Sequence, residues 1–197
     1  MYKVIVFLLT YSIYTFSFAQ EAKELNKAPK ATKQESKEVE KINWMGFEEA
    51  VELNKQEPKK FLIDVYTSWC GWCKKMDRTT FTQPEVVAYV SKHYHAVKLN
   101  AERKDTVRLD DRMFVNEKPD GRRHPHQLAI SLMQGKMSYP TIVYLDEAGN
   151  MLQPIPGFQS AENILPILHY FGEDAYKSQE WPEFQKSYKK AQDSDTP

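Results

Sequence analysis

The only two cysteines of this 197-residue chain, Cys70 and Cys73, are separated by two residues and closely follow an apolar run at 61–66. A short, almost continuous apolar run is typical of a strand that is covered on both faces. The residues from Lys74 onward favour a helix. The cysteines are therefore predicted at the carboxyl end of a buried strand, where the next helix begins, and this arrangement indicates an α/β fold.

The periodicity of apolar residues and the positions of turn-forming residues predict the other elements. A helix near 43–53, with Asn43 as its cap and Phe47 and Ala50 on its apolar face, precedes the strand at 61–66. The remaining predicted elements are a helix after Pro84, a strand at 95–100, a polar irregular segment at 101–123, a helix within 124–134, a hairpin at 138–146 and from 151 with Gly149 and Asn150 in its turn, a helix at 160–170, and a C-terminal helix with Trp181, Phe184 and Tyr188.

The predicted place of the cysteines is one where functional groups often lie in an open α/β sheet. Loops at the carboxyl ends of strands face a crevice, and the next helix begins with unpaired amide hydrogens. A thiolate there is stabilised by the positive end of the helix dipole, with Lys74 and Lys75 close by in sequence. We expect Cys70 to be the more exposed and more acidic thiol, and Cys73 the more buried one.

Asp64 lies in the middle of the apolar run at 61–66. A carboxylate inside a doubly covered strand costs several kcal/mol if it is ionised and unpaired, so it is usually protonated or paired. Asp64 is therefore predicted to be a buried acid beneath the cysteines, with a raised pKa, that exchanges a proton with Cys73. The alternative is that Asp64 points to water at the edge of a sheet.

Three interpretations of the cysteine pair are open: a structural disulfide, half of a metal site, or a redox pair. A bond between Cys70 and Cys73 closes a very short loop and so constrains little of the unfolded chain, which disfavours a purely structural role. Histidines that could complete a copper or zinc site occur in two short pairs, which are typical of surface residues. These histidines are His93, His95, His124 and His126. No metal and no cofactor is expected.

The N-terminal residues 1–19 combine one positive charge at Lys3, an apolar stretch, and small residues at Ser17 and Ala19. This pattern predicts a secretory signal peptide that is cleaved after Ala19. An uncleaved membrane anchor is the alternative, but a helix over 4–19 spans only about 24 Å of a hydrocarbon core about 30 Å thick. Residues 20–41, rich in mixed charges, are predicted to be a flexible linker. The protein is expected in the periplasm or another exported compartment, where disulfides persist.

Length and charge limit the remaining possibilities. The chain is long enough for one domain with short additions. Its 27 lysines and arginines balance its 27 aspartates and glutamates, so no net field attracts nucleic acid or an anionic membrane.

From about Asn43 to Tyr170 the chain resembles the thioredoxin family. Trp-Cys-Gly-Trp-Cys-Lys at 69–74 resembles the family's Trp-Cys-Gly-Pro-Cys-Lys motif, and Asp64 stands where the family has a buried aspartate. Further matching features are Lys98, which approaches that aspartate in the family, the cis-proline loop at Tyr139 and Pro140, and Gly157 near the last strand.

The resemblance implies a thioredoxin-like fold, with a central mixed sheet flanked by helices, over 42–172, to which 173–197 adds a C-terminal helical extension. It also implies thiol–disulfide exchange: Cys70 attacks a partner's disulfide, and Cys73, deprotonated by Asp64, releases the product. The residues expected to contact the partner chain are Trp69, Gly71, Trp72, Tyr139 and Pro140.

Two departures from the family affect this interpretation. Trp72 replaces the proline of the motif, so the usual inference of redox direction from the central dipeptide does not apply. The segment 101–123 is longer than in a minimal thioredoxin and is interpreted as a tolerated surface insertion. We expect an exported oxidoreductase, acting as a reductant rather than an oxidant on protein disulfides and served by a redox partner protein. The alternative is a metal-binding or chaperone-like module that does not use redox chemistry.

Overall fold

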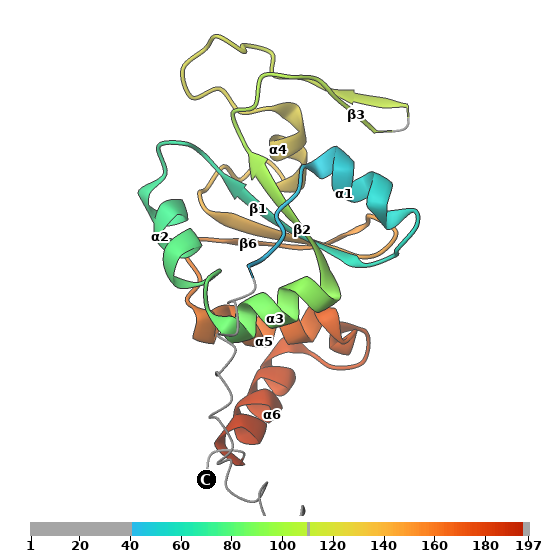
Figure 1. Ribbon diagram of the computed structural model, residues 1–197, viewed down its shortest axis with the longest axis vertical. Coiled ribbons are helices and arrows are strands. Elements are labelled where there is room, and N and C mark those ends of the chain that lie inside the picture. The colour runs from blue at the N-terminus through green and yellow to red at the C-terminus, as the bar shows by residue number, and fades with distance from the viewer. Residues whose placement is uncertain (1–40, 110, 195–197) are drawn as a thin grey trace, which may run out of the picture. The chain divides into compact units, whose positions relative to one another are not determined.

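The computed structural model describes residues 41–109 and 111–194 (Figure 1). The predicted signal peptide at 1–19 and the predicted linker, except for Lys41, lie outside the described residues. In chain order the elements are α1 (Phe47–Asn54), β1 (Lys60–Tyr66), α2 (Gly71–Thr79), α3 (Pro84–His93), β2 (Tyr94–Asn100), β3 (Val107–Leu109), β4 (Arg112–Phe114), α4 (Gln127–Leu132), β5 (Thr141–Leu145), β6 (Met151–Pro156), α5 (Ala161–Gly172), the 3-10 helix η1 (Ala175–Lys177) and α6 (Trp181–Ser194).

The main sheet is mixed, as the resemblance implied, and its strand order is β2-β1-β5-β6. β1 pairs with β2 in parallel and with β5 in antiparallel orientation, while β5 pairs antiparallel with β6. The parallel pair requires a long crossover, which α2 and α3 supply. β1 is thus an inner strand, and its residues are buried from Lys60 to Val65.

Helices cover both faces of this sheet, with α1 and α4 on one side and α3 and α5 on the other (Figure 1). Side chains alternate along β1, so Phe61, Ile63 and Val65 pack in the core cluster that contains α1 and α4. Leu62 packs in the other cluster, which contains Met76 of α2 together with residues of α3 and α5. Asp64 has the same parity as Leu62, and alternation therefore points it to the side of the sheet that α2 covers.

The predicted helix cap at Asn43 is wrong. The chain is still extended at Met45, where the amide donates to the carbonyl of Ala96 at 3.0 Å and the carbonyl accepts from the amide of Lys98 at 3.1 Å. The helix cap is instead Gly46, whose amide donates to the Glu49 carboxylate at 3.2 Å. Pairing with β2 thus competes successfully with helix formation at the residues that follow Asn43.

The segment 101–123 is not irregular throughout, contrary to the sequence-based expectation. It contains the small hairpin of β3 and β4, in which Val107 pairs with Phe114. Each of these strands has only three residues. That length is too short for a period-two alternation of apolar and polar residues to be recognised.

The predicted C-terminal helix is confirmed as α6. It packs on α5 through aromatic rings: the centroid of Tyr170 lies 5.2 Å from that of Trp181 and 5.1 Å from that of Phe184. No helix among the described residues is long and apolar enough to cross a membrane.

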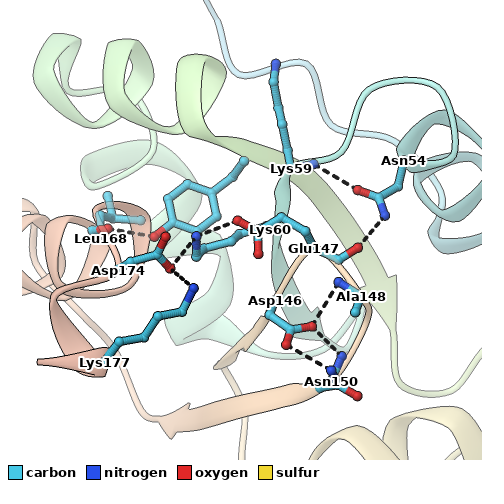
Figure 2. A network of polar contacts seen from close by, with 11 residues as sticks. Asn54, Lys59, Lys60, Asp146, Glu147, Ala148, Asn150, Leu168, Asp174 and Lys177 are labelled. Atoms are coloured by element: carbon cyan, nitrogen blue, oxygen red, sulfur yellow. Dashed lines mark hydrogen bonds and ion pairs between the residues drawn. The ribbon is translucent and has the colours of Figure 1, made fainter.

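Lys60, at the start of β1, lies between two carboxylates from later parts of the chain (Figure 2). Its Nζ is 2.6 Å from Glu147 in the β5–β6 turn and 2.9 Å from Asp174, which precedes η1. Burial alone would lower the pKa of Lys60, but the hydrogen bonds to Glu147 and Asp174 outweigh it and raise the pKa. This lysine therefore ties the central strand to the hairpin turn and to the C-terminal region.

Replacing Lys60 with methionine is expected to lower the free energy of unfolding by about 1–3 kcal/mol. The Lys60 side chain is only 4% exposed, but its partners are 40% and 42% exposed and remain hydrated in the variant, which limits the loss. Urea denaturation of the Lys60→Met and Lys177→Met variants measures the effect. Lys177 contacts the same Asp174 from the surface, so its replacement is expected to leave the free energy of unfolding unchanged within error. Equal losses of stability in the two variants would contradict the structural role assigned to Lys60.

Candidate redox site

Cys70 and Cys73 form a disulfide across the first turn of α2, with an S–S distance of 2.10 Å. Cys70 caps the helix, and its Sγ accepts a hydrogen bond from the Cys73 amide at 3.0 Å. Cys70 is 5% exposed and Cys73 1%, so the expected order of exposure holds although the difference is small. A sulfur at this position lies among the free amide hydrogens at the positive end of the helix, where negative charge is stabilised.

The two tryptophans of the motif lie at the surface beside the disulfide. Trp69 is 47% exposed and Trp72 is 57% exposed, as expected for Trp72 from its position between the cysteines. The ring of Trp69 makes an edge contact with Tyr139, with the centroids 5.9 Å apart, and Trp72 packs on Phe158 at 5.5 Å. Each cysteine of the disulfide is thus preceded in the chain by an exposed aromatic ring.

The loop before β5 contains a cis peptide bond between Tyr139 and Pro140, as the resemblance implied. The Pro140 carbonyl accepts from the amide of Gly157 at 2.8 Å. Gly157 has a φ of +91°, a conformation that glycine adopts without strain. Through Tyr139, which contacts Trp69, this loop adjoins the cysteine motif.

Asp64 is fully buried, so the alternative of a solvent-facing position at a sheet edge is wrong. Its Oδ2 accepts from Lys98 Nζ at 2.5 Å, and its Oδ1 has no hydrogen-bond partner among the residues that the structure describes. Burial raises the pKa of Asp64 to about 6, the charge of Lys98 opposes this rise, and the charge of Asp77 adds to it. The carboxyl can therefore gain or lose a proton near neutral pH, as a proton-transfer group must.

Asp77 is a residue that the sequence analysis missed. Its carboxylate, on α2, accepts a hydrogen bond from the same Nζ of Lys98 that pairs with Asp64. Lys98 thus joins β1, β2 and α2. The signal in the sequence is the four-residue spacing from Cys73 to Asp77, which puts both on one face of the helix.

The histidines have structural partners. His95 and His126 are buried, contrary to the surface positions expected for them. The Nε2 of His95 is 2.7 Å from the Glu57 carbonyl, and the Nε2 of His126 is 2.9 Å from the Asp105 carbonyl. Within residues 41–109 and 111–194, no group of three or more histidine, cysteine, aspartate or glutamate residues is arranged to hold a metal.

The segment 101–123 reaches the site, which its interpretation as a surface insertion did not anticipate. The carboxylate of Glu102 accepts the indole hydrogen bond of Trp69, with N–O distances of 3.0 and 3.2 Å. The guanidinium carbon of Arg123 lies 4.6 Å from the centroid of the Trp69 ring. No local sequence pattern signals these contacts, because they join residues that are 33 and 54 positions apart.

Comparison with known proteins identifies relatives. Residues 47–172 match the model of a family described as thioredoxin-like domain. A disulfide bond reductase, DsbH, from Chlamydia pneumoniae is 25% identical over 112 residues. This alignment covers 56% of the present chain and 60% of the relative, so the chain spans less than two thirds of the relative's length.

Solved structures show the same fold. A DsbH oxidoreductase matches with a TM-score of 0.51 and 18% identity, over 75% of this chain and 95% of the other. A putative disulphide isomerase from Bacteroides thetaiotaomicron matches with a TM-score of 0.50 and 21% identity, over 72% and 98% of the two chains. At these identities the likeness establishes the shared fold.

Proposed function

This chain belongs to the thioredoxin-like domain family, and from that premise we propose that it is a thiol–disulfide oxidoreductase that acts on partner proteins through Cys70 and Cys73. The observation that carries the proposal is the disulfide at the start of α2, where Cys70 Sγ accepts from the Cys73 amide. Both cysteines of the chain are in this bond. The bond closes a very short loop and so constrains the unfolded chain little, which favours a role in disulfide exchange over a structural role.

The proposed reaction begins with the reduced pair. The Cys70 thiolate attacks one sulfur of a partner's disulfide, the partner's S–S bond breaks, and its second sulfur leaves as a thiolate that takes a proton from solvent. Cys73 then loses its proton to the Asp64 carboxylate and attacks Cys70 Sγ. The bond between Cys70 and the partner breaks, and the partner's remaining sulfur leaves as a thiolate that takes a proton from solvent, while Asp64 returns its proton to solvent. The partner then has two thiols, the Cys70–Cys73 bond has formed, and two electrons have passed from the protein to the partner.

Other residues are assigned supporting roles. Asp64 lies on the face of β1 that α2 covers, and its raised pKa suits a proton acceptor. Lys98 holds Asp64 in place through the ion pair. Trp69 and Trp72 offer exposed aromatic surface to the partner chain, and Gly71, Tyr139 and Pro140 complete the proposed contact surface.

We propose that the protein reduces disulfides in an exported compartment, such as a bacterial periplasm. The name of the DsbH relative, a disulfide bond reductase, supports this direction, and the pattern of residues 1–19 supports export. Since the chain has no cysteine outside the pair, another protein must return electrons to it. We further propose a thioredoxin-like domain over 42–172, with 20–41 as a linker and 173–197 as a helical extension.

A stoichiometric exchange experiment tests this function. The reduced protein, spanning residues 20–197, is mixed with insulin, quenched with acid, and alkylated for mass spectrometry. Each molecule is expected to regain the Cys70–Cys73 disulfide while one insulin disulfide becomes two thiols. If the pair stays reduced, or if the protein reduces insulin no faster than a free dithiol does, the proposed function is wrong.

A further inference from the structure

Each exposed tryptophan beside the disulfide has a cation on its ring. The guanidinium carbon of Arg123 is 4.6 Å from the centroid of Trp69. The Nζ of Lys75 is 4.7 Å from the centroid of Trp72 and 5.0 Å from that of Phe158. These distances are within the range of cation–π attraction. Two positive charges therefore lie on exposed rings of the motif, Arg123 on the residue before Cys70 and Lys75 on the residue before Cys73.

The loop that carries Arg123 is fixed by buried polar contacts. The side-chain amide of Asn116 donates to the carbonyls of Arg103 at 3.1 Å and His124 at 2.9 Å, which joins the two ends of the segment. The amide of His126 donates to the Ala101 carbonyl at 2.7 Å. Glu102, at the start of the segment, binds the indole N–H of Trp69. Arg123 is thus presented at Trp69 by a supported loop.

Neither cation forms an ion pair with a carboxylate within the described part of the chain. The other cations with structural roles differ in this respect: Lys98 pairs with Asp64 and Asp77, and Arg103 pairs with Glu48 and Asp105. Of the carboxylates near the motif, Asp77 is paired with Lys98, whereas Glu102 accepts from the neutral indole of Trp69 and keeps its negative charge there.

The exposed cations Lys74, Lys75 and Arg123 outnumber this carboxylate, so the surroundings of the motif are cationic although the whole chain has no net charge. Lys74 and Lys75 are exposed on α2, and Arg123 is exposed where it contacts the ring of Trp69. A guanidinium that lies on an aromatic ring still has N–H donors free at its edge, in a geometry that matches a carboxylate.

We propose that Arg123 and Lys75 select partner segments in which the reactive disulfide is flanked by aspartate or glutamate. This inference rests on the proposed function and specifies its substrate class. A carboxylate on either side of the partner's cystine pairs with one of the two cations while the apolar part of the segment covers the tryptophans. Complementary charges at the rim of an interface act mainly on the association rate, which then depends on salt.

Three synthetic disulfide peptides of one sequence, with aspartate, glutamine or lysine flanking each cysteine, provide the test. The rate constant for their reduction by the protein is measured at low and high salt. At about 10 mM salt, where screening extends over about 30 Å, we expect the aspartate peptide to react about tenfold faster than the lysine peptide. At about 1 M salt, where the screening length is about 3 Å, the two rates should converge.

Matched variants connect this preference to the two side chains. The Arg123→Gln/Lys75→Gln double variant should lose the preference, whereas Arg123→Lys/Lys75→Arg, which keeps both charges, should retain it. Lys189→Gln/Lys190→Gln removes the same charge from exposed positions on α6 and should behave like the unmodified protein. Equal rates for the three peptides, or a preference that survives in the first double variant, would overturn the inference. No reaction with any peptide would instead reject the proposed function itself.

Discussion

Replacing Cys70 with serine is expected to lower the rate of insulin reduction by at least about a thousandfold, because loss of a covalent nucleophile removes the catalysed path. The pair forms the only disulfide among the described residues, and the chain has no other cysteine to replace either member. The measurement is the initial rate of insulin reduction with dithiothreitol as the electron source.

Cys73→Ser is the matched control, because it makes the same chemical change three residues away. It retains the attacking sulfur but has no thiol to release the partner, so it is expected to accumulate a mixed disulfide between Cys70 and the substrate. Non-reducing electrophoresis and mass spectrometry detect this adduct. A Cys70→Ser variant that is fully active, or a stable adduct on Cys73 instead of Cys70, would show that the assigned order of attack is wrong.

Replacing Asp64 with asparagine is expected to remove a large part of the pH dependence of stability. The folded protein raises the pKa of Asp64 from 3.8 to about 6, so the folded state binds the proton more tightly than the unfolded state does. Below about pH 4 the carboxyl therefore does not lower the free energy of unfolding. The loss grows as the pH rises through about 6 and reaches about 3 kcal/mol for a pKa shift of about two units. Urea denaturation of the oxidised unmodified protein and the Asp64→Asn variant, from about pH 4 to about pH 8, measures this pH dependence of the free energy of unfolding.

Asp77→Asn serves as the control for this variant. It removes the other carboxylate that binds Lys98 but retains the buried carboxyl of Asp64, so most of the pH dependence should persist. Parallel stability curves for Asp64→Asn and the unmodified protein would contradict the raised pKa. In exchange assays Asp64→Asn should also prolong the mixed disulfide, because Cys73 loses its proton acceptor.

The parts of the fold that were predictable from sequence are those with strong local patterns. The apolar run at 61–66 identified the inner strand β1, and the predicted burial of Asp64 within it is confirmed. The glycine and asparagine at 149–150 located the hairpin of β5 and β6, and the aromatic spacing of Trp181 and Phe184 located α6. In each case a single stretch of chain contains the whole signal.

The errors arose where contacts between distant residues decide the structure. Because Met45 pairs with β2, α1 begins only at Phe47. The sequence around Asn43 gives no indication of this pairing. His126 is buried because the Asp105 carbonyl accepts its ring hydrogen bond. A polar residue in a loop sequence gives no indication that such a partner exists.

The candidate site shows the same division. The cysteine motif, Asp64 and the Tyr139–Pro140 loop were expected from the sequence and its resemblance, and the structure places Tyr139 against Trp69. Asp77, Glu102 and Arg123 were not expected in the site. Glu102 and Arg123 belong to the segment 101–123, whose path depends on tertiary contacts, among them those of Asn116.

The central claim is that Cys70 and Cys73 form a redox pair that reduces partner proteins. Its most direct test is the reduction potential of the pair, obtained by equilibrating residues 20–197 with glutathione mixtures and counting thiols by mass spectrometry. We predict a value near that of thioredoxin, about −270 mV. A value near −120 mV, typical of a strong periplasmic oxidant, or a pair that does not equilibrate with glutathione, would contradict the account.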